Sequence, residues 1–328
     1  MTMEWGALDI VVPVRLSSPE RTLQIVRCYD DLMTRCLEAN LDVRVIIVAG
    51  SFDVFVTIIG AAALNRTTFL VLRAPAPSAD SPQNGKLVNV SAAIALASSD
   101  SILVCDDDAR PTLRAVTAIC DTLSTVDHVR LSVRYGAPSL FDLIDLSGIF
   151  VVNFCSPEKQ FWGHFGFRLS ALQKCGGLPL DVLFDELAVY RRLRNAGFTS
   201  VYSTNTAMDM ISHRDLREFM SQRLRYAYEN FAYPLRFVVT LSILPLLVGV
   251  ERAFGRIEAL ISAVAVSGLV AALACLGQSR YDRGRHSKWA WLWAPLWFWF
   301  YPVLSWVALG MRSVGGVRFG TERLSRAI

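Results

Sequence analysis

The sequence predicts an α/β domain with a mostly parallel sheet, followed by C-terminal membrane helices. Strand-like runs alternate with helix-like segments up to about residue 230, a pattern typical of a parallel sheet covered on both faces. Long apolar segments replace this pattern downstream of about Pro234. Of the 328 residues, 53% are hydrophobic and only 19% are charged, so the mean hydropathy is high for a soluble enzyme.

The first part of the chain predicts the elements of the sheet domain in order. The β-branched run LDIVVPV at residues 8–14 predicts a buried strand. A helix is expected to begin beside Ser18 and Pro19, which are typical of a helix start, and to end near Ala39. Further strands are expected at 42–48, 67–72 and 101–105, helices at 86–97 and 111–124, and a loop at 74–85.

Charge and cysteine content exclude several classes of protein. A formal net charge of +4 is too small to indicate a nucleic-acid partner. Seven scattered cysteines without a C-x-x-C pair argue against a disulfide framework and for a reducing compartment. No signal peptide is visible before the first strand, so the catalytic part is expected in the cytosol.

Three consecutive aspartates, Asp106, Asp107 and Asp108, follow the predicted strand 101–105. Adjacent carboxylates repel one another unless a cation lies among them. Alternate residues of an extended segment point the same way, so Asp106 and Asp108 are expected to face one site at the carboxyl edge of the sheet. Carboxylate oxygens and substrate phosphates are the ligands of Mg²⁺. The triplet therefore predicts a divalent-metal site, with a solvated acidic turn as the alternative.

The stretch 84–111, from Asn-Gly-Lys to Asp-Asp-Asp-Ala-Arg-Pro, resembles a signature of processive and lipid-directed glycosyltransferases of family 2. The nearest branch is that of ceramide glucosyltransferases, among cellulose-synthase-like enzymes. The resemblance implies a Rossmann-like GT-A fold, a nucleoside-diphosphate sugar as donor, and Mg²⁺ or Mn²⁺ as metal. It places Asp106 and Asp108 around the metal, Asp107 in the donor site and Lys86 near the nucleotide. An exposed lysine is the alternative for Lys86.

Two further blocks extend the resemblance. The stretch FWGHFGFR at 161–168 is similar to the family's glycine-rich segment, which would place His164 near donor or acceptor; a structural histidine is the alternative. The stretch 184–198 resembles an acidic pair before an R-L-x-x-A-G helix, whose aspartate is the general base in the family. Here the pair is reversed, so Glu186 occupies the base position and Asp185 precedes it. Glu186 is favoured, and an acidic helix N-terminus is the alternative.

A fourth block, QRLRY, is similar to the family's Q-x-x-R-W with tyrosine in place of tryptophan. The resemblance implies that Arg225 lies near the diphosphate and Tyr226 near the acceptor sugar, with Gln222 in the same site. An amphipathic basic helix lying on lipid, with Arg223 among the residues that face headgroups, is the alternative and is compatible with the first interpretation.

Three apolar segments, at 237–250, 259–276 and 289–311, predict membrane association. The basic loop 278–288 is expected in the cytoplasm, so the first two segments form a hairpin. The third either spans or is re-entrant, with the re-entrant form preferred because it is rich in tryptophan. The expected domains are a catalytic domain at 1–214, an interface helix at 215–233, a transmembrane or re-entrant region at 234–311 and a basic tail at 312–328.

Together these features predict an inverting, metal-dependent hexosyltransferase in the cell membrane, multi-pass and with a cytoplasmic catalytic domain. It would move a sugar from a nucleotide sugar to a lipid or lipid-linked acceptor. The rival is a non-catalytic scaffold with a degenerate fold, because the acidic residues expected after the second strand are missing and Asp53 is the nearest nucleotide candidate. A polysaccharide synthase would need more apolar segments, and a transporter would need paired intramembrane charges.

Overall fold

The computed structural model describes residues 7–14, 18–65, 69–74, 83–159, 161–212, 216–314, 317–319 and 322–324. Contacts divide the chain into two compact units, one built from residues 1–134 and 161–211 and the other from 135–160 and 212–327. Residues 135–160, which the sequence placed inside the catalytic domain, therefore group with the C-terminal helices. Each unit is described separately.

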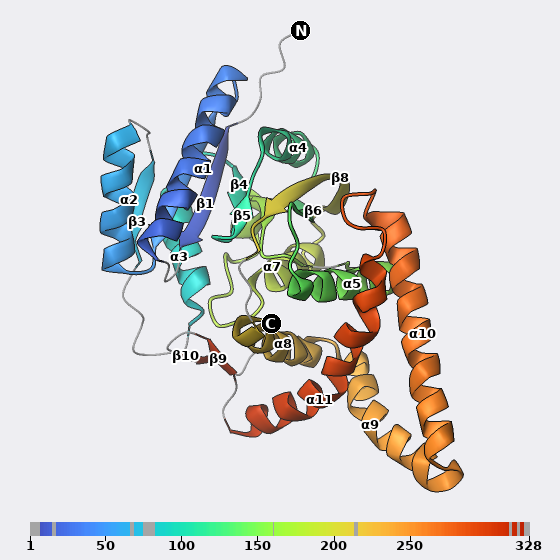
Figure 1. The fold of residues 1–328 in the computed structure, drawn as a ribbon. Coiled ribbons are helices and arrows are strands. Elements are labelled where there is room, and N and C mark those ends of the chain that lie inside the picture. Colours follow the sequence, from blue (N-terminus) through green and yellow to red (C-terminus); the bar gives the residue numbers. More distant parts are fainter. Residues whose placement is uncertain are drawn as a thin grey trace. The chain divides into compact units, whose positions relative to one another are not determined.

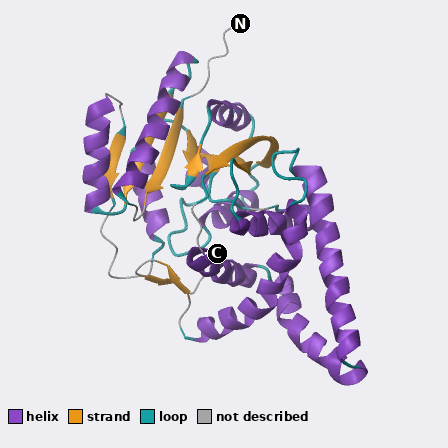
Figure 2. Ribbon diagram, viewed as in Figure 1, coloured by secondary structure: helices purple, strands orange, loops and turns teal. Residues whose placement is uncertain are grey.

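The first unit contains a mixed eight-stranded sheet with the order β3-β2-β1-β4-β7-β6-β8-β5 (Figures 1 and 2). Its strands are β1 (Leu8–Val14), β2 (Val43–Ala49), β3 (Leu70–Arg73), β4 (Ser101–Val104), β5 (Ala109–Arg110), β6 (His128–Tyr135), β7 (Phe165–Arg168) and β8 (Ser200–Met210). The pairs among β1, β2, β3 and β4 are parallel. The pairs β4–β7, β6–β7 and β5–β8 are antiparallel. The mostly parallel sheet predicted from the sequence thus describes only the half up to β4.

Side-chain caps determine where the main helices of this unit begin. The helices are α1 (Pro19–Glu38), α2 (Phe52–Asn65), α3 (Gly85–Ile94), α4 (Leu113–Leu123), α6 (Leu169–Lys174) and α7 (Asp185–Asn195). The Ser18 side chain accepts from the backbone N–H of Arg21, and the Asn84 side chain accepts from that of Lys86. Such caps satisfy donors that the first turn leaves without partners. The helix starts at α1 and α3 are confirmed, α2 was not predicted, and most of the expected loop 74–85 lies outside the described residues.

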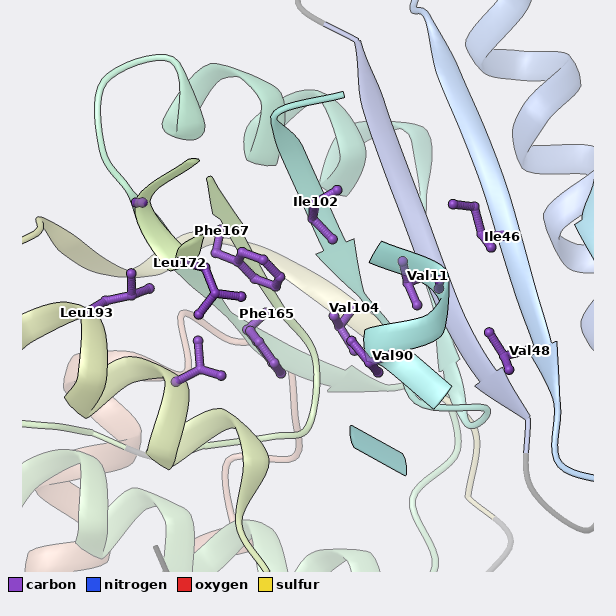
Figure 3. Close-up of a cluster of buried hydrophobic side chains, with 13 residues drawn as sticks. Val11, Ile46, Val48, Val90, Ile102, Val104, Phe165, Phe167, Leu172 and Leu193 are labelled. Carbon is purple, nitrogen blue, oxygen red and sulfur yellow. The ribbon is translucent and has the colours of Figure 1, made fainter. Parts of the chain in front are cut away.

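The core of the sheet positions the site because it fixes β4, β7 and their covering helices. Phe165 and Phe167 of β7 pack with Val90 of α3 and Leu193 of α7 on one face (Figure 3). Gly166 lies between them on β7, and a Cβ added there would lie 3.2 Å from Ile119 of α4. Alternation along β7 therefore directs phenylalanines to one face and leaves room for α4 on the other.

The second unit is mostly helical and also contains a two-stranded antiparallel sheet, formed by β9 (Val317–Phe319) and β10 (Glu322–Leu324). Its helices are α5 (Leu140–Cys155), α8 (Leu216–Glu229), α9 (Pro234–Phe254), α10 (Arg256–Tyr281) and α11 (Ala294–Ser313), with short 3₁₀ turns at Asn230–Ala232 and Ala290–Trp293. Three segments, Pro234–Phe254, Arg256–Tyr281 and Ala290–Ser313, are long and apolar enough to cross a membrane. The three predicted apolar segments are confirmed as helices. Whether the third spans or is re-entrant stays a prediction.

Two glycines let helices of this unit approach one another closely. A Cβ on Gly277 of α10 would lie 2.0 Å from the carbonyl oxygen of Phe150 in α5, and one on Gly148 of α5 would lie 2.0 Å from the ring of Trp297 in α11. Small residues that permit backbone contact are typical of helix interfaces in membranes. By contrast, nothing lies within 4 Å of a Cβ built on Gly268 of the same helix α10.

We expect Gly277→Ala to destabilise the second unit because its methyl group would meet the α5 backbone, which cannot rotate away. Overpacking of this kind costs about 1–3 kcal/mol. Gly268→Ala is the matched control in the same helix and should leave stability unchanged or slightly raised. Thermal unfolding of both variants in nanodiscs measures the difference, and equal melting temperatures for the two would contradict the close α5–α10 contact.

Candidate active site

Three elements bring charged side chains together at the carboxyl end of β4. Lys86, in the first turn of α3, places its Nζ 2.5 Å from Oδ1 of Asp106, which follows β4. The same Nζ lies 2.6 Å from Oδ2 of Asp185, the first residue of α7. It also donates a hydrogen bond to the carbonyl oxygen of Gly163 at 3.3 Å. One ammonium group thus lies between two carboxylates that are far apart in the sequence.

The negative charge of this cluster exceeds what its ammonium group can neutralise. Burial alone would lower the pKa of Lys86, but attraction to Asp106 and Asp185 outweighs it and raises that pKa, so the ammonium stays protonated. Burial raises the pKa of Asp106, with Asp185 and Asp108 adding to the effect and Lys86 opposing it. Carboxylates that repel one another in this way favour an additional cation.

The other two aspartates of the triplet have separate contacts. Asp107 pairs with Arg21 of α1, with 3.2 Å between Oδ1 and Nη2. The carbonyl oxygen of Asp108 accepts from the backbone N–H of Ile211 at 3.0 Å. Because the charge of Asp108 raises the pKa of Asp106, these two carboxylates share one electrostatic environment. Asp107 instead belongs to a contact with α1.

Gly163 links the acidic turn to α7. Its φ is +83°, and a Cβ built there would lie 2.1 Å from Oδ2 of Asp106, so only glycine fits. The backbone N–H groups of Trp162 and Gly163 both donate to Oε2 of Glu186 at 2.6 Å. Glu186 therefore holds in place the turn at Trp162 and Gly163, which lies in close contact with Asp106.

Glu186 itself is buried, with an exposed fraction of 2%. Within the described residues no group hydrogen-bonds to its second oxygen, Oε1. Burial raises the pKa of Glu186 to about 8, against the lowering effects of Arg130 and of the two backbone N–H groups. A carboxyl group that titrates near neutral pH beside a charged cluster is typical of functional sites.

The remaining candidates of the first unit lie outside this cluster. His164 is buried, its Nε2 donates to the carbonyl oxygen of Leu131 at 3.3 Å, and burial lowers its pKa to about 4. These contacts favour the structural interpretation of this histidine. Asp53 is exposed in the first turn of α2. Asp9, the other carboxylate near the start of the sheet, binds the guanidinium of Arg44 through both its oxygens.

The predicted residues Gln222, Arg225 and Tyr226 lie on α8 of the second unit. Arg223 does not face headgroups as expected: it is buried and pairs with Asp145 of α5, with 2.8 Å between Nη2 and Oδ1. Its guanidinium also lies 4.5 Å above the ring of Tyr226. The sequence reasoning missed Asp145, although a carboxylate in the apolar run LFDLIDLSGIFVV was a visible signal.

A family model described as glycosyl transferase family 21 matches residues 72–309, which include β4, α7, α9, α10 and most of α11. The chain belongs to glycosyl transferase family 21. The resemblance noted in the sequence was to family 2 enzymes, so the glycosyltransferase assignment is confirmed at the level of activity class. No curated protein sequence matches the chain.

Solved structures are similar to this family 21 glycosyltransferase to different degrees. A mannosyltransferase from Pyrobaculum calidifontis, in complex with GDP-Man and Mn²⁺, has a TM-score of 0.52 at 15% identity, over 93% of this chain and 87% of the other. For TarS from S. aureus the TM-score is 0.44 at 13% identity, over 96% of this chain and 94% of the other. For glucosyl-3-phosphoglycerate synthase from Mycobacterium tuberculosis the TM-score is 0.45 at 15% identity, over 66% of this chain and 75% of the other. The first shows the predicted GT-A fold, and a shared fold alone identifies no substrate.

The acidic cluster of the family 21 chain fits a divalent ion that arrives with phosphate ligands. Among the side chains described, no three His, Cys, Asp or Glu residues are arranged to hold a metal by themselves. Mg²⁺ needs only one or two protein carboxylates when substrate phosphates and waters complete its coordination. The excess negative charge around Asp106 and Asp108 matches this requirement.

We expect Lys86→Met to destabilise the metal-free protein, because Asp106 and Asp185 would then face each other without a counter-charge. The melting temperature should fall by about 3–8 °C. Adding Mn²⁺ should raise the melting temperature of the variant more than that of the wild type. Differential scanning fluorimetry with and without MnCl₂ measures both effects. Lys174→Met, at an exposed lysine of α6, is the control. An equal fall in melting temperature for both variants would contradict the role of Lys86 as the counter-charge of Asp106 and Asp185.

Proposed function

We propose that this family 21 protein transfers a sugar from a nucleoside-diphosphate sugar to a lipid or lipid-linked acceptor at the membrane, with inversion of the anomeric carbon. The observation that most strongly supports this proposal is that Lys86, Asp106 and Asp185 meet at the carboxyl end of β4, where Gly163 lies close to Asp106. Ligands of open α/β sheets bind at this edge. The three apolar helices favour an amphiphilic acceptor over a soluble one.

Asp106 and Asp108 are the proposed ligands of a Mg²⁺ or Mn²⁺ ion. Once bound, such an ion offsets the charge that develops on the departing diphosphate. Lys86 lies at the start of α3, where its ammonium group and the helix N-terminus both favour phosphate. Its present partners are carboxylates, so its role in donor binding is to exchange one of them for a phosphate oxygen.

Glu186 is the proposed general base. Two backbone N–H groups anchor Oε2, and Oε1 is left to accept the proton of the acceptor hydroxyl. The hydroxyl oxygen of the acceptor then bonds to the anomeric carbon while the bond from this carbon to the diphosphate breaks, and attack from the face opposite the leaving group inverts the centre. Asp185 is engaged by Lys86, which makes it the weaker candidate for the same task.

Binding of both substrates is proposed to involve α8. Arg225 carries a guanidinium fork suited to the phosphate oxygens of the donor diphosphate, and Tyr226 offers a ring on which the acceptor sugar can stack. The basic loop between α10 and α11 supports a cytoplasmic catalytic unit through the positive-inside rule, and the length of the apolar helices supports more than one crossing. The specific relation to ceramide glucosyltransferases belongs to this proposal, since it rests on the sequence blocks alone.

Asp108→Ala should abolish formation of the glycolipid product, because one of two proposed metal ligands is lost. Mass spectrometry of lipid extracts from cells that express the wild type, the variant or neither measures this. We expect one lipid class to gain a hexose-sized mass in the wild type only. Arg194→Ala, at an exposed position of α7, is the expression-matched control. No new lipid in wild-type cells, together with no Mn²⁺-dependent binding of UDP or GDP, would favour the scaffold.

Glu186→Gln should lower transfer by about 10²–10⁴-fold. Its amide oxygen can still accept both backbone hydrogen bonds, but it cannot take a proton. Asp185→Asn keeps the size of the neighbouring side chain and should lose less. In the wild type, transfer should rise as pH increases through about 8, because only the ionised Glu186 is a base. Both variants are assayed in membranes with the lipid acceptor that the extracts identify, and a larger loss in Asp185→Asn would move the base to Asp185.

A further inference from the structure

β6 places an arginine inside the first unit, close to the candidate base. Arg130 has an exposed fraction of 3%. Its guanidinium carbon lies 4.2 Å above the ring of Phe161, 4.6 Å from the ring centre of Tyr190 and 5.6 Å from that of Tyr202. Burial of a cationic group is costly unless charge and packing partners compensate. The three rings supply part of that compensation through cation–π contacts.

The two nearest of these rings belong to the segments that anchor Glu186. Phe161 directly precedes Trp162, whose backbone N–H donates to Glu186. Tyr190 lies four residues after Glu186 on α7, so it projects from the same side of the helix. Arg130 therefore lies between the turn that holds Glu186 and the helix that carries it.

We propose that Arg130 is a positioning residue that stabilises the ionised form of Glu186 and holds the two segments around it in place for proton abstraction. It touches neither donor nor acceptor and acts only through Glu186. This inference rests on the proposed role of Glu186 as the base. It adds a requirement that the sequence blocks do not contain, namely a buried positive charge on β6.

The charged surroundings of Glu186 support this role. Burial raises the pKa of Glu186, the charge of Arg130 lowers it, and that of Asp185, the preceding residue on α7, raises it again. The other nearby cation, Lys86, is bound to Asp185 and Asp106. His164, directly before β7, is neutral at physiological pH because burial lowers its pKa. Arg130 is thus the cation that stabilises the Glu186 carboxylate.

The aromatic rings explain why an arginine suits this position. A planar guanidinium stacks on ring faces and stays charged at all physiological pH values, whereas an ammonium group needs a stronger hydration shell. The rings also exclude water, which strengthens the interaction between the guanidinium and the carboxylate. Arg194 contacts the same Tyr190 from the solvent side, where its Nη1 donates to the tyrosine hydroxyl at 2.9 Å.

Infrared spectroscopy of the full chain in nanodiscs tests the inference without any substrate. The carboxylic-acid C=O band that disappears in Glu186→Gln reports protonated Glu186, and in the wild type it should titrate near pH 8. Arg130→Met should move this midpoint upward by about one to three pH units, since an opposite charge has been removed. Arg130→Lys, which keeps the positive charge, should return the midpoint most of the way to its wild-type value. Arg194→Met should leave the midpoint at its wild-type value.

Unchanged midpoints in Arg130→Met would overturn the inference, as would equal shifts in Arg194→Met. If the wild type shows no such band, Glu186 is ionised over the whole pH range measured. The band should then appear in Arg130→Met, and its absence from that variant would also overturn the inference. Arg130→Gln, which retains a polar side chain of similar length, replaces the Met variant if that variant does not fold. The band midpoint tests the Arg130–Glu186 coupling, whereas loss of transfer in Glu186→Gln tests the base separately.

Discussion

The site depends on one interaction, the ammonium group of Lys86 between the carboxylates of Asp106 and Asp185. It joins the start of α3, the end of β4 and the start of α7, which are three ends of secondary structure that the sheet brings to one edge. The cap of Asn84 fixes where α3 begins and hence where Lys86 projects. Gly163 must be glycine because the neighbouring turn presses directly on Asp106. The cap of Asn84, the two contacts of Lys86 and the absence of a side chain at Gly163 together determine the geometry of this cluster.

Charge balance explains how the two carboxylates of α7 differ, although they are adjacent in the sequence. Asp185 is paired with Lys86. Glu186 is buried, and backbone N–H groups and the charge of Arg130 offset the cost of that burial. A buried acid with one anchored oxygen keeps its geometry during a reaction, and its surroundings then decide whether it is ionised. The chemistry therefore rests on residues behind the visible cluster.

The sequence predicts the first half of the sheet well because β1, β2 and β4 are rich in β-branched residues, pair in parallel and are largely buried. Helix α2 was missed because its residues are almost all apolar, which gives no helical period. The acidic triplet was found from local pattern and Lys86 from the family resemblance, and the structure brings Lys86 to Asp106. Arg130 could not be found this way, because an arginine in the alternating strand HVRLSVRY is ordinarily read as solvent-exposed. Its burial depends on α7, which covers that side from sixty residues away along the chain.

The second unit uses buried charge in the same manner. Asp145 can lie within the apolar helix α5 because Arg223 of α8 faces it at 2.8 Å and stacks on Tyr226. Apolar helix faces can slide past one another at little cost, whereas an ion pair in a low-dielectric setting is strong only in one register. Removal of either partner would leave an unpaired buried charge, which is far more costly than the pair itself is stabilising. The pair therefore fixes where α8 lies along α5, and α8 carries Arg225 and Tyr226 in the same turn. An arginine that resembles a headgroup contact in the sequence instead sets the position of its neighbours.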